Sequence, residues 1–336
     1  MLWLYDRDLS AIASLPEYDS IITTWKFGDH STLDGRLPAS AYDKVAAAYF
    51  ATIADEDEVY LVEGFDLVTE NGQRYTDLAP WRAASALLHT RTVVGTRRYS
   101  SKKHGYIAKD LMATLTGDRA IANLAFGTGD TLGTSIDKQI SWGDMGAVVL
   151  DLLAAGHLGL RTRLDGTTIY VDLFAPAEIS GAIGDAYGNT TSSKLSKQIT
   201  DWRNYAIVLG EGEGSSRVRV DVDQTSGGER RELYVDASDL RKTVDGETLS
   251  DAAYEATLAQ RGAERLAENR VVQFAEASLS APLDCGAVAW FDAGAWSDWL
   301  MVTESVTTRE GGTVRHSATI GEPPVTIRKI LMKRSS

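Results

Sequence analysis

The side chains that most often carry catalysis are few and scattered in this sequence. Metal and acid–base sites need histidines or carboxylates at fixed spacings, such as HExxH with its two histidines one helical turn apart. No histidine fits such a spacing: they are His30, His89, His104, His157 and His316. The motifs GxSxG and GxxxxGK[ST], which hold a serine nucleophile and a phosphate group, are absent. We predict no catalytic residue, no metal site and no cofactor, and we do not expect an enzyme.

Two glycine-rich stretches invite comparison with anion-binding loops, but neither has the required pattern. In 126–133 the glycine spacing differs from GxGxxG, and the carboxylate of Asp130 would repel phosphate. The second stretch alternates two residue types: Gly210, Glu211, Gly212, Glu213 and Gly214. Such a loop presents negative charge and lets backbone approach backbone, so we interpret it as part of a crowded subunit contact.

Aromatic rings give the chain one other way to bind a ligand. Of the eight tryptophans, only Trp290, Trp296 and Trp299 lie close together in sequence. Packing in a core or an interface explains most tryptophans, because their large rings bury well. A sugar-binding platform formed by these three residues stays open as the alternative.

The net charge of −13 argues against a surface that grips nucleic acid, since phosphate binding needs clustered lysines and arginines. The charges are nevertheless segregated. Seven acidic residues and no basic one lie in 54–70, whereas seven basic residues and no acidic one lie in 82–109. These segments are either two solvated faces or complementary patches that meet between copies of the chain.

Other bulk features point to an ordinary globular protein. The 336 residues are enough for two or more packed domains, and no apolar run is long enough to span a bilayer. The first residues lack the pattern of a signal peptide, so we expect synthesis in the cytoplasm. A single cysteine, Cys285, cannot form an intramolecular disulfide.

The hydrophobic pattern is mostly that of β-structure, and it is clearest in 206–235. Residues 217–223 alternate between charged residues and valine, which places Val218, Val220 and Val222 on one face. Gly227-Gly228 reads as a turn, so we predict an antiparallel hairpin whose return strand adds Leu233 and Val235 to that face.

Similar patterns predict the other elements. Strands are expected over 2–6, 21–27, 33–38, 58–63, 64–70, 73–76, 158–164, 167–174, 271–279, 286–291, 299–307 and 313–320. Helices are expected over 41–50, 77–89 and 106–115, from Ser141 to Gly156, and over 249–268. A basic loop is expected at 97–103, and an internal linker or exposed loop at 176–193.

Four short motifs give the chain a resemblance to a known family. They are DWRNY at 201–205, VLGEGEG at 208–214, RRE at 230–232 and DASDL at 236–240. In this order they resemble the tail-hub family of long-tailed siphophages, which is similar to the baseplate hub of contractile-tailed phages. Ser238 stands where that family usually has arginine. The resemblance extends from about Trp3 to Gly321.

The resemblance implies a β-rich α+β fold with two barrel-like antiparallel β domains and helical insertions. The corresponding division is a first barrel-like part over 1–78, a helical lobe over 79–157, a hairpin and linker over 158–194, a second barrel-like domain over 195–321, and a basic tail over 322–336.

The function it implies is that of a structural hub at the distal end of a phage tail. Such a hub is a homotrimeric ring around the tape-measure protein and the DNA path, with DNA passing through without specific binding. Its partners would be distal tail and tail-tube proteins and fibres or receptor-binding proteins. A carbohydrate- or receptor-binding protein of the tail tip is the alternative.

Candidate interface residues follow from the motifs, the basic loop and the tail. They are Arg97, Arg98, Lys102, Lys103, Arg203, Asn204, Glu211, Glu213, Arg230, Arg231, Arg328 and Lys329. An excess of acidic side chains is expected along the channel, because DNA slides best past a surface that repels it.

Overall fold

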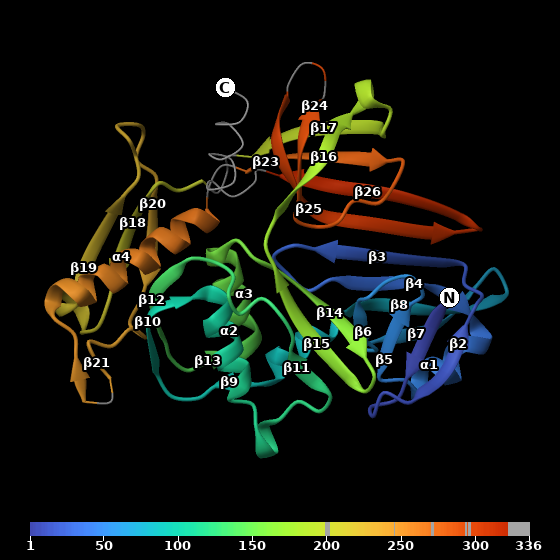
Figure 1. The fold of residues 1–336 in the computed structure, drawn as a ribbon, viewed down its shortest axis with the longest axis horizontal. Helices are drawn as coiled ribbons and strands as arrows, with labels where there is room; N and C mark the ends of the chain where they lie inside the picture. The colour runs from blue at the N-terminus through green and yellow to red at the C-terminus, as the bar shows by residue number, and fades with distance from the viewer. Residues whose placement is uncertain (199–201, 245, 270–271, 293, 295–296, 322–336) are drawn as a thin grey trace.

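The computed structural model describes residues 1–198, 202–244, 246–269, 272–292, 294 and 297–321, and every structural statement below concerns these residues. They form a mostly β protein with helical insertions, which confirms the β-rich α+β prediction (Figure 1). None of the sheets formed by these residues closes on itself, so the barrel-like part of that prediction is not confirmed. No described helix is long and apolar enough to cross a membrane.

The largest sheet has ten strands and joins the two ends of the described chain. Its path is β17 (Thr190–Gln198), β23 (Val272–Leu279), β26 (Thr313–Gly321), β25 (Ser297–Glu310), β3 (Ser20–Lys26), β4 (Thr32–Pro38), β8 (Gln73–Arg82) and β7 (Phe65–Glu70). Off this path, β24 (Ala287–Asp292) pairs with β25, and β16 (Ala177–Gly184) pairs with β24.

The long strand β25 holds this sheet together. Its first part pairs with β24, from Ser297 to Met301, and its second part pairs with β3, from Glu304 to Glu310. In Figure 1 the blue strands of the N-terminal part therefore lie beside the red strands of the C-terminal part. The sheet thus unites segments that the sequence assigned to different domains, and the domain boundaries themselves stay a prediction.

A second sheet covers the N-terminal half of the large one. Its strands are β2 (Ala11–Leu15), β1 (Leu2–Tyr5), β5 (Phe50–Ile53) and β6 (Val59–Leu61), with η1 (Ala39–Ala41) and α1 (Tyr42–Ala47) before β5. Leu2 and Leu4 of this sheet meet Ile21, Leu33 and Trp81 of the large sheet in one fully buried core. Because β1 and β3 alternate apolar and partly exposed positions, each contributes one face to that core.

Residues 84–174 form a unit that we call the helical lobe. Its helices are η2 (Ala84–Thr90), α2 (His104–Ala113), η3 (Gly117–Arg119) and α3 (Met145–Gly156). Its strands are β9 (Thr92–Val93) paired with β13 (Gly143–Asp144), β10 (Arg97–Lys103) paired with β12 (Ser135–Ile140), and the sheet β11 (Leu124–Phe126), β15 (Thr168–Phe174), β14 (Gly159–Asp165). Met145, Val149, Leu152 and Leu153 of α3 are buried in its core, as their helical spacing predicts.

The structure corrects three predictions in and before this lobe. The predicted helix 77–89 is instead the end of β8 followed by η2, because β8 pairs with strands on both sides and Pro80 cannot donate a helical hydrogen bond. The predicted basic loop 97–103 is β10, paired with β12. The helix expected from Ser141 begins at Met145, since the Asp144 side chain accepts a hydrogen bond from Ala147 N at 2.7 Å and caps it.

Residues 202–269 form a unit that we call the α4 module. Its elements are β18 (Tyr205–Leu209), η5 (Gly214–Ser216), β19 (Arg219–Asp223), β20 (Glu232–Asp236), β21 (Thr243–Val244), β22 (Glu247–Thr248) and α4 (Asp251–Glu268). In Figure 1, α4 lies across one face of the sheet formed by β18, β19 and β20.

The hairpin predicted in this module is wrong about which strands pair, but it is right about which side chains share the apolar face. Strand β18 lies between the two predicted partners, antiparallel to β19 and parallel to β20. A continuous apolar strand belongs in the middle of a sheet, and Ala206 and Val208 of β18 are indeed fully buried. Val220, Val222 and Leu233 from the flanking strands share the face that packs on α4.

Helix α4 approaches this sheet closely at a glycine. The helix is capped by Ser250, whose hydroxyl accepts a hydrogen bond from Ala253 N at 3.2 Å. At Gly262 an added Cβ would come within 2.7 Å of a Val208 methyl and 2.8 Å of a Val222 methyl. Glycine here lets the helix lie directly on the valines of the sheet.

The expected linker at 176–193 is also wrong. These residues contain β16, η4 (Asp185–Tyr187) and the start of β17, which extend the large sheet by parallel pairing with β24 and antiparallel pairing with β23. Their small polar residues gave no periodic apolar signal, because the three residues of η4 and the exposed face of β16 interrupt it. The hairpins predicted at Asn71-Gly72 and Gly311-Gly312 are confirmed.

The N-terminal sheets meet the helical lobe at a buried carboxyl group. Glu58, only 3% exposed, accepts hydrogen bonds from Thr162 N at 2.8 Å and from the Thr162 hydroxyl. The same hydroxyl accepts from Val59 N at 3.0 Å. Burial, the largest cause, raises the pKa of Glu58 to about 7, and the nearby charge of Glu56 adds to it.

Because the folded state holds this proton more tightly than the unfolded chain, the contribution of Glu58 to stability is full below pH 4.5 and falls as pH rises to about 7. The fall amounts to roughly 3 kcal/mol in the free energy of unfolding. Glu58→Gln, which resembles the protonated acid, should remove it. Urea unfolding of wild type, Glu58→Gln and the exposed control Glu255→Gln across pH 4.5–7.5 measures this, and equal slopes for all three chains would contradict it.

Candidate functional site

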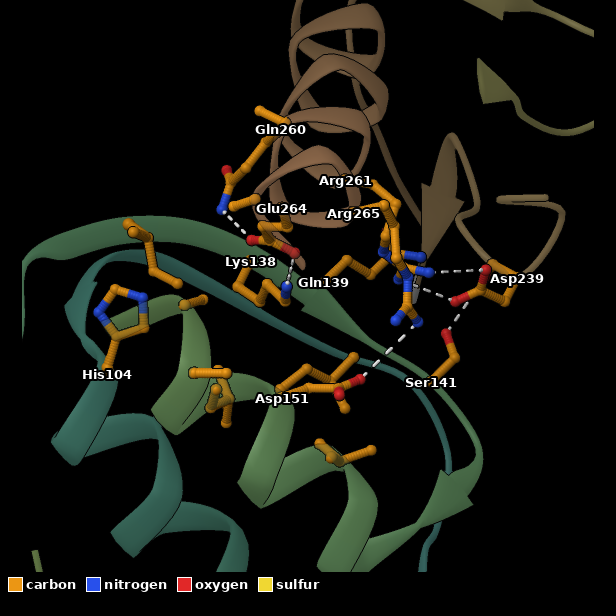
Figure 2. Close-up of a pocket in the computed structure, with 18 of the residues that line it drawn as sticks. His104, Lys138, Gln139, Ser141, Asp151, Asp239, Gln260, Arg261, Glu264 and Arg265 are labelled. Carbon is orange, nitrogen blue, oxygen red and sulfur yellow. Dashed lines mark hydrogen bonds and ion pairs between the residues drawn. The ribbon is translucent and has the colours of Figure 1, made fainter. Parts of the chain in front are cut away.

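A groove lies between the helical lobe and the α4 module. Its volume is about 610 Å³. Figure 2 shows α4 above it and the strands and helices of the lobe below it. The lobe contributes polar and apolar side chains, and the apolar ones are Ile136, Ile140, Trp142, Val148, Leu152, Ala154 and Ala155. Helix α4 contributes mainly polar ones: Gln260, Arg261, Glu264 and Arg265.

One ion pair crosses the groove away from solvent. Lys138 Nζ lies 2.5 Å from Glu264 Oε2, and the two side chains are only 14% and 19% exposed. Gln260 Nε2 donates to the other carboxylate oxygen of Glu264 at 3.0 Å. A carboxylate with a partner on each oxygen is held in one orientation, so α4 is fixed against β12 at this point.

More polar contacts continue along the groove (Figure 2). Arg261 lies 3.1 Å from Asp239 within the α4 module, and Ser141 Oγ of the lobe donates to the Asp239 carbonyl at 3.3 Å. Arg265 reaches Asp151 of α3 at 3.9 Å. The Lys138–Glu264 and Arg265–Asp151 pairs therefore join the two walls of the groove, whereas the Arg261–Asp239 pair lies within one of them.

Arg98 makes the most extensive contact between lobe and module. Its guanidinium donates to the carbonyls of Arg241 at 3.0 Å, Lys242 at 2.9 Å and Glu247 at 3.2 Å, and its Nε donates to Gln139 Oε1 at 3.2 Å. The planar fork of donors suits several carbonyls at once. The sequence proposed Arg98 for contact with another copy, and the structure places it between two units of the same chain.

The groove does not have the arrangement of a catalytic site. His104 is 2% exposed, its Nδ1 lies 3.0 Å from the Thr134 carbonyl, and burial lowers its pKa. Ser141 Oγ is engaged with a carbonyl rather than with a base. In the part of the chain that the structure describes, no three histidine, cysteine, aspartate or glutamate residues are placed to hold a metal ion.

The glycine-rich stretch at 126–133 has a structural role. Thr128 donates to Asp172 Oδ1 from both its backbone N, at 2.7 Å, and its hydroxyl, at 3.0 Å. Gly129 faces Leu173 so closely that an added Cβ would lie 2.6 Å from the Leu173 Cβ. The glycines let this loop pack on β15.

The other candidate residues of the lobe have partners within the chain. Arg97 lies 3.4 Å from Asp110, Lys103 Nζ donates to the Thr131 carbonyl at 2.7 Å, and Lys102 Nζ lies 5.0 Å from the centre of the Tyr106 ring. The acidic segment 54–70 is engaged as well. Its partnered glutamates are Glu56 with Arg309, Glu58 with Thr162, Glu63 with Arg82 and Glu70 with Arg36. Contact between copies through these segments stays a prediction.

Most candidate residues of the DWRNY and RRE motifs shape the start of the three-stranded sheet. Asn204 is 4% exposed, accepts from Arg231 N at 2.8 Å and donates to the Glu229 carbonyl at 2.8 Å. Arg230 lies 3.5 Å from the centre of the Tyr205 ring. The remaining contacts are Arg231 over Trp202, Arg203 to the Trp202 carbonyl, and Glu211 to Arg241 and Lys242 N.

Glu213 helps to cap η5, with its side chain and that of Ser216 bonding each other's backbone N–H. The candidates Arg328 and Lys329 lie outside the described residues. The structure therefore brings the RRE and DWRNY residues together at one end of the sheet, whereas the basic residues of β10 lie in the lobe.

Of the proposed tryptophan platform, the structure describes two members. Trp290 and Trp299 pair across β24 and β25 with ring centres 6.0 Å apart and the rings edge to face. Both are half-buried, and Trp299 packs against the core of the large sheet. Trp296 lies outside the described residues.

Sequence reasoning missed a hydrogen-bonded network that includes two of the histidines. His30 Nε2 lies 3.0 Å from His89 Nε2, although the two residues are 59 positions apart. No spacing rule could find this pair, because only the tertiary fold brings the β3–β4 connection onto η2.

The buried ion pair of the groove should show strong energetic coupling. A double-mutant cycle with Lys138→Ala and Glu264→Ala is expected to give a coupling of about 1–3 kcal/mol in the free energy of unfolding, because loss of one partner leaves a poorly solvated charge. Arg315 and Glu310 form the matched control, since they are also 2.5 Å apart but 62% and 57% exposed. Their coupling should stay below about 1 kcal/mol. Equal couplings would show that the groove pair does not fix α4.

Several solved structures share this fold along almost the whole chain. The prophage tail protein gp18 from Listeria monocytogenes EGD-e aligns with a TM-score of 0.58 at 10% identity, covering 99% of this chain and 98% of that one. The 43 kDa tail protein of prophage MuSo2 from Shewanella oneidensis gives 0.57 at 11% identity, covering 96% and 98%. A tail protein from Neisseria meningitidis MC58 gives 0.57 at 11% identity, covering 96% of both chains.

At such low identity these similarities show a shared fold. No curated protein matches the sequence. A family model described as Siphovirus ReqiPepy6 Gp37-like protein matches residues 1–296 of the 336 in the chain. The resemblance to siphophage tail proteins is thereby confirmed, and the chain belongs to the Siphovirus ReqiPepy6 Gp37-like family.

Proposed function

We propose that this tail protein is a structural hub at the distal end of a siphophage tail, without enzymatic activity. The observation that carries the proposal is the fold, which matches that of three phage tail proteins over 96–99% of this chain. A ring of three copies would surround the tape-measure protein and the DNA path. Distal tail and tail-tube proteins would bind its faces, and fibres or receptor-binding proteins its outside.

The way the chain is joined suits a mechanical role. The β3–β25 pairing unites the N-terminal and C-terminal strands in one sheet. The Lys138–Glu264 pair and Arg98 fix the α4 module to the helical lobe, and Glu58 fixes the lobe to the N-terminal sheets. A part that transmits force in a tail needs this kind of rigidity, because a loose hinge would absorb the displacement.

The charge of the chain suits a channel that DNA passes. The net charge is −13, and Asp55, Asp57 and Asp66 of the acidic segment are exposed. An acidic lumen repels phosphate and keeps DNA from sticking. We include an acidic lumen in the proposal.

The oligomeric state of the purified chain tests the ring. Light scattering across a concentration and salt series should give three chain masses, for the chain alone or after addition of tail-tube protein. The double variant Lys102→Glu, Lys103→Glu should weaken the assembly at least about tenfold, because reversed charges at an interface repel. Lys44→Glu, an exposed change on α1, is the control. A monomer under every condition would contradict the proposal.

A further inference from the structure

Three buried or half-buried side chains and the exposed Asp144 form a continuous hydrogen-bonded chain where the N-terminal sheets meet the helical lobe. Ser85 Oγ lies 2.8 Å from His30 Nδ1, His30 Nε2 lies 3.0 Å from His89 Nε2, and His89 Nδ1 lies 2.6 Å from Asp144 Oδ1. His30 belongs to the β3–β4 connection, Ser85 and His89 to η2, and Asp144 caps α3. Three segments far apart in sequence therefore meet in one network.

The carboxylate of Asp144, the last residue in the network, sets the direction of every hydrogen bond. Asp144 also accepts from Ala147 N at 2.7 Å, and a carboxylate at a helix N-terminus is an acceptor. His89 must then carry its hydrogen on Nδ1, which leaves its Nε2 as the acceptor when the ring is neutral. His30 donates from Nε2, so its Nδ1 accepts from the Ser85 hydroxyl. With both rings neutral, this arrangement satisfies every bond.

One added proton gives a second complete arrangement. The proton enters on His89 Nε2, which then donates to His30 Nε2. The hydrogen of His30 moves from Nε2 to Nδ1 and is donated to Ser85 Oγ, so His30 changes tautomer and stays neutral. With a second added proton, no arrangement of the hydrogens satisfies every hydrogen bond. Two N–H groups would then face each other 3.0 Å apart, and the bond between the rings must break.

Some of the charged groups around the network lower the pKa of His30, and others raise it. Asp29 accepts from His30 N at 2.7 Å, and Arg82 and Glu63 form an ion pair nearby at 2.6 Å. Burial lowers the pKa of His30 to about 4, with His89 and Arg82 lowering it further and Asp29 and Glu63 opposing. His89 packs against the first turn of α3, where a Cβ on Gly146 would come within 2.6 Å of its ring.

We propose that Ser85, His30, His89 and Asp144 form a proton-operated latch, which fastens the helical lobe to the N-terminal sheets and opens when both imidazoles carry a proton. Neutral and singly protonated pairs keep the latch closed by reversing the His30 bonds. The doubly protonated pair separates the β3–β4 connection from η2 and from the start of α3. The latch rests on contacts within the chain and is independent of the proposed hub role.

The sign of its pH dependence follows from the neutral, buried His30. An unfolded histidine binds its proton near pH 6.5, whereas His30 in the folded chain does so near pH 4. Its contribution to stability is therefore full above pH 6.5 and is lost as pH falls toward 4. Between pH 7.5 and 5.0 the unfolding equilibrium constant should rise about 30-fold through this group alone.

The tautomers test the latch directly in wild-type protein. The full chain labelled with ¹⁵N-histidine gives long-range ¹H–¹⁵N spectra in which Nδ1–H, Nε2–H and charged rings are distinct. As pH falls from 7.5, His30 should pass from Nε2–H to Nδ1–H while staying neutral, as the pair takes up its first proton. A His30 ring that charges near pH 6.5 without changing tautomer would overturn the latch.

Urea unfolding at pH 7.5 and 5.0 measures how much His30 changes the unfolding equilibrium constant between these pH values. The change in the unfolding constant between the two pH values should be about 30-fold larger in wild type than in His30→Gln. His316→Gln, in β26, should reduce this change by a smaller factor, because burial also lowers the pKa of that half-buried histidine. If this change in wild type is less than about threefold larger than in His30→Gln, the proposal is wrong. If His30→Gln does not fold, the spectra of wild type and of His89→Gln still decide.

Discussion

The structure depends on the antiparallel pairing of β25 with β3. This pairing joins strands from residues 20–82 to strands from residues 272–321, with seven residue pairs from Glu304–Lys26 to Glu310–Ser20. The helical lobe and the α4 module are both inserted between these strands in sequence. They can be large and irregular because the sheet that carries them is completed by residues outside them.

Each insertion is fastened by a different kind of contact. The lobe meets the N-terminal sheets through the buried acid Glu58 and the His30–His89 network, whereas the α4 module meets the lobe through Arg98 and the Lys138–Glu264 pair. The first two contacts titrate with opposite sign. Glu58 stabilises more as pH falls, and neutral His30 stabilises less, so their effects largely offset between about pH 4.5 and 6.5. The arginine and lysine contacts keep their charge throughout this range.

Local patterns predicted most strands, the approximate positions of the long helices and the valine face that packs on α4, whereas the N-caps of α3 and α4 are Asp144 and Ser250 rather than the predicted Ser141 and Thr248. They failed where the partner is distant in sequence. The alternation at 217–223 identified a half-buried strand, but only the tertiary fold puts β18 between it and β20. Nothing local marks Arg98 as a contact to the module, or His30 as the neighbour of His89. Interface contacts also depend on partners that are distant in sequence. The family motifs identify candidate residues but do not show which groups those residues contact.

The proposed hub role requires this fold to be one protomer of a closed ring at the tail tip. Cryo-electron microscopy of the intact phage tail tests it most directly. We expect density for this chain at the distal end, three copies around the channel, with the β3–β25 sheet intact in each copy. A single copy, or density confined to a peripheral fibre away from the channel, would contradict the claim and leave only the shared tail-protein fold.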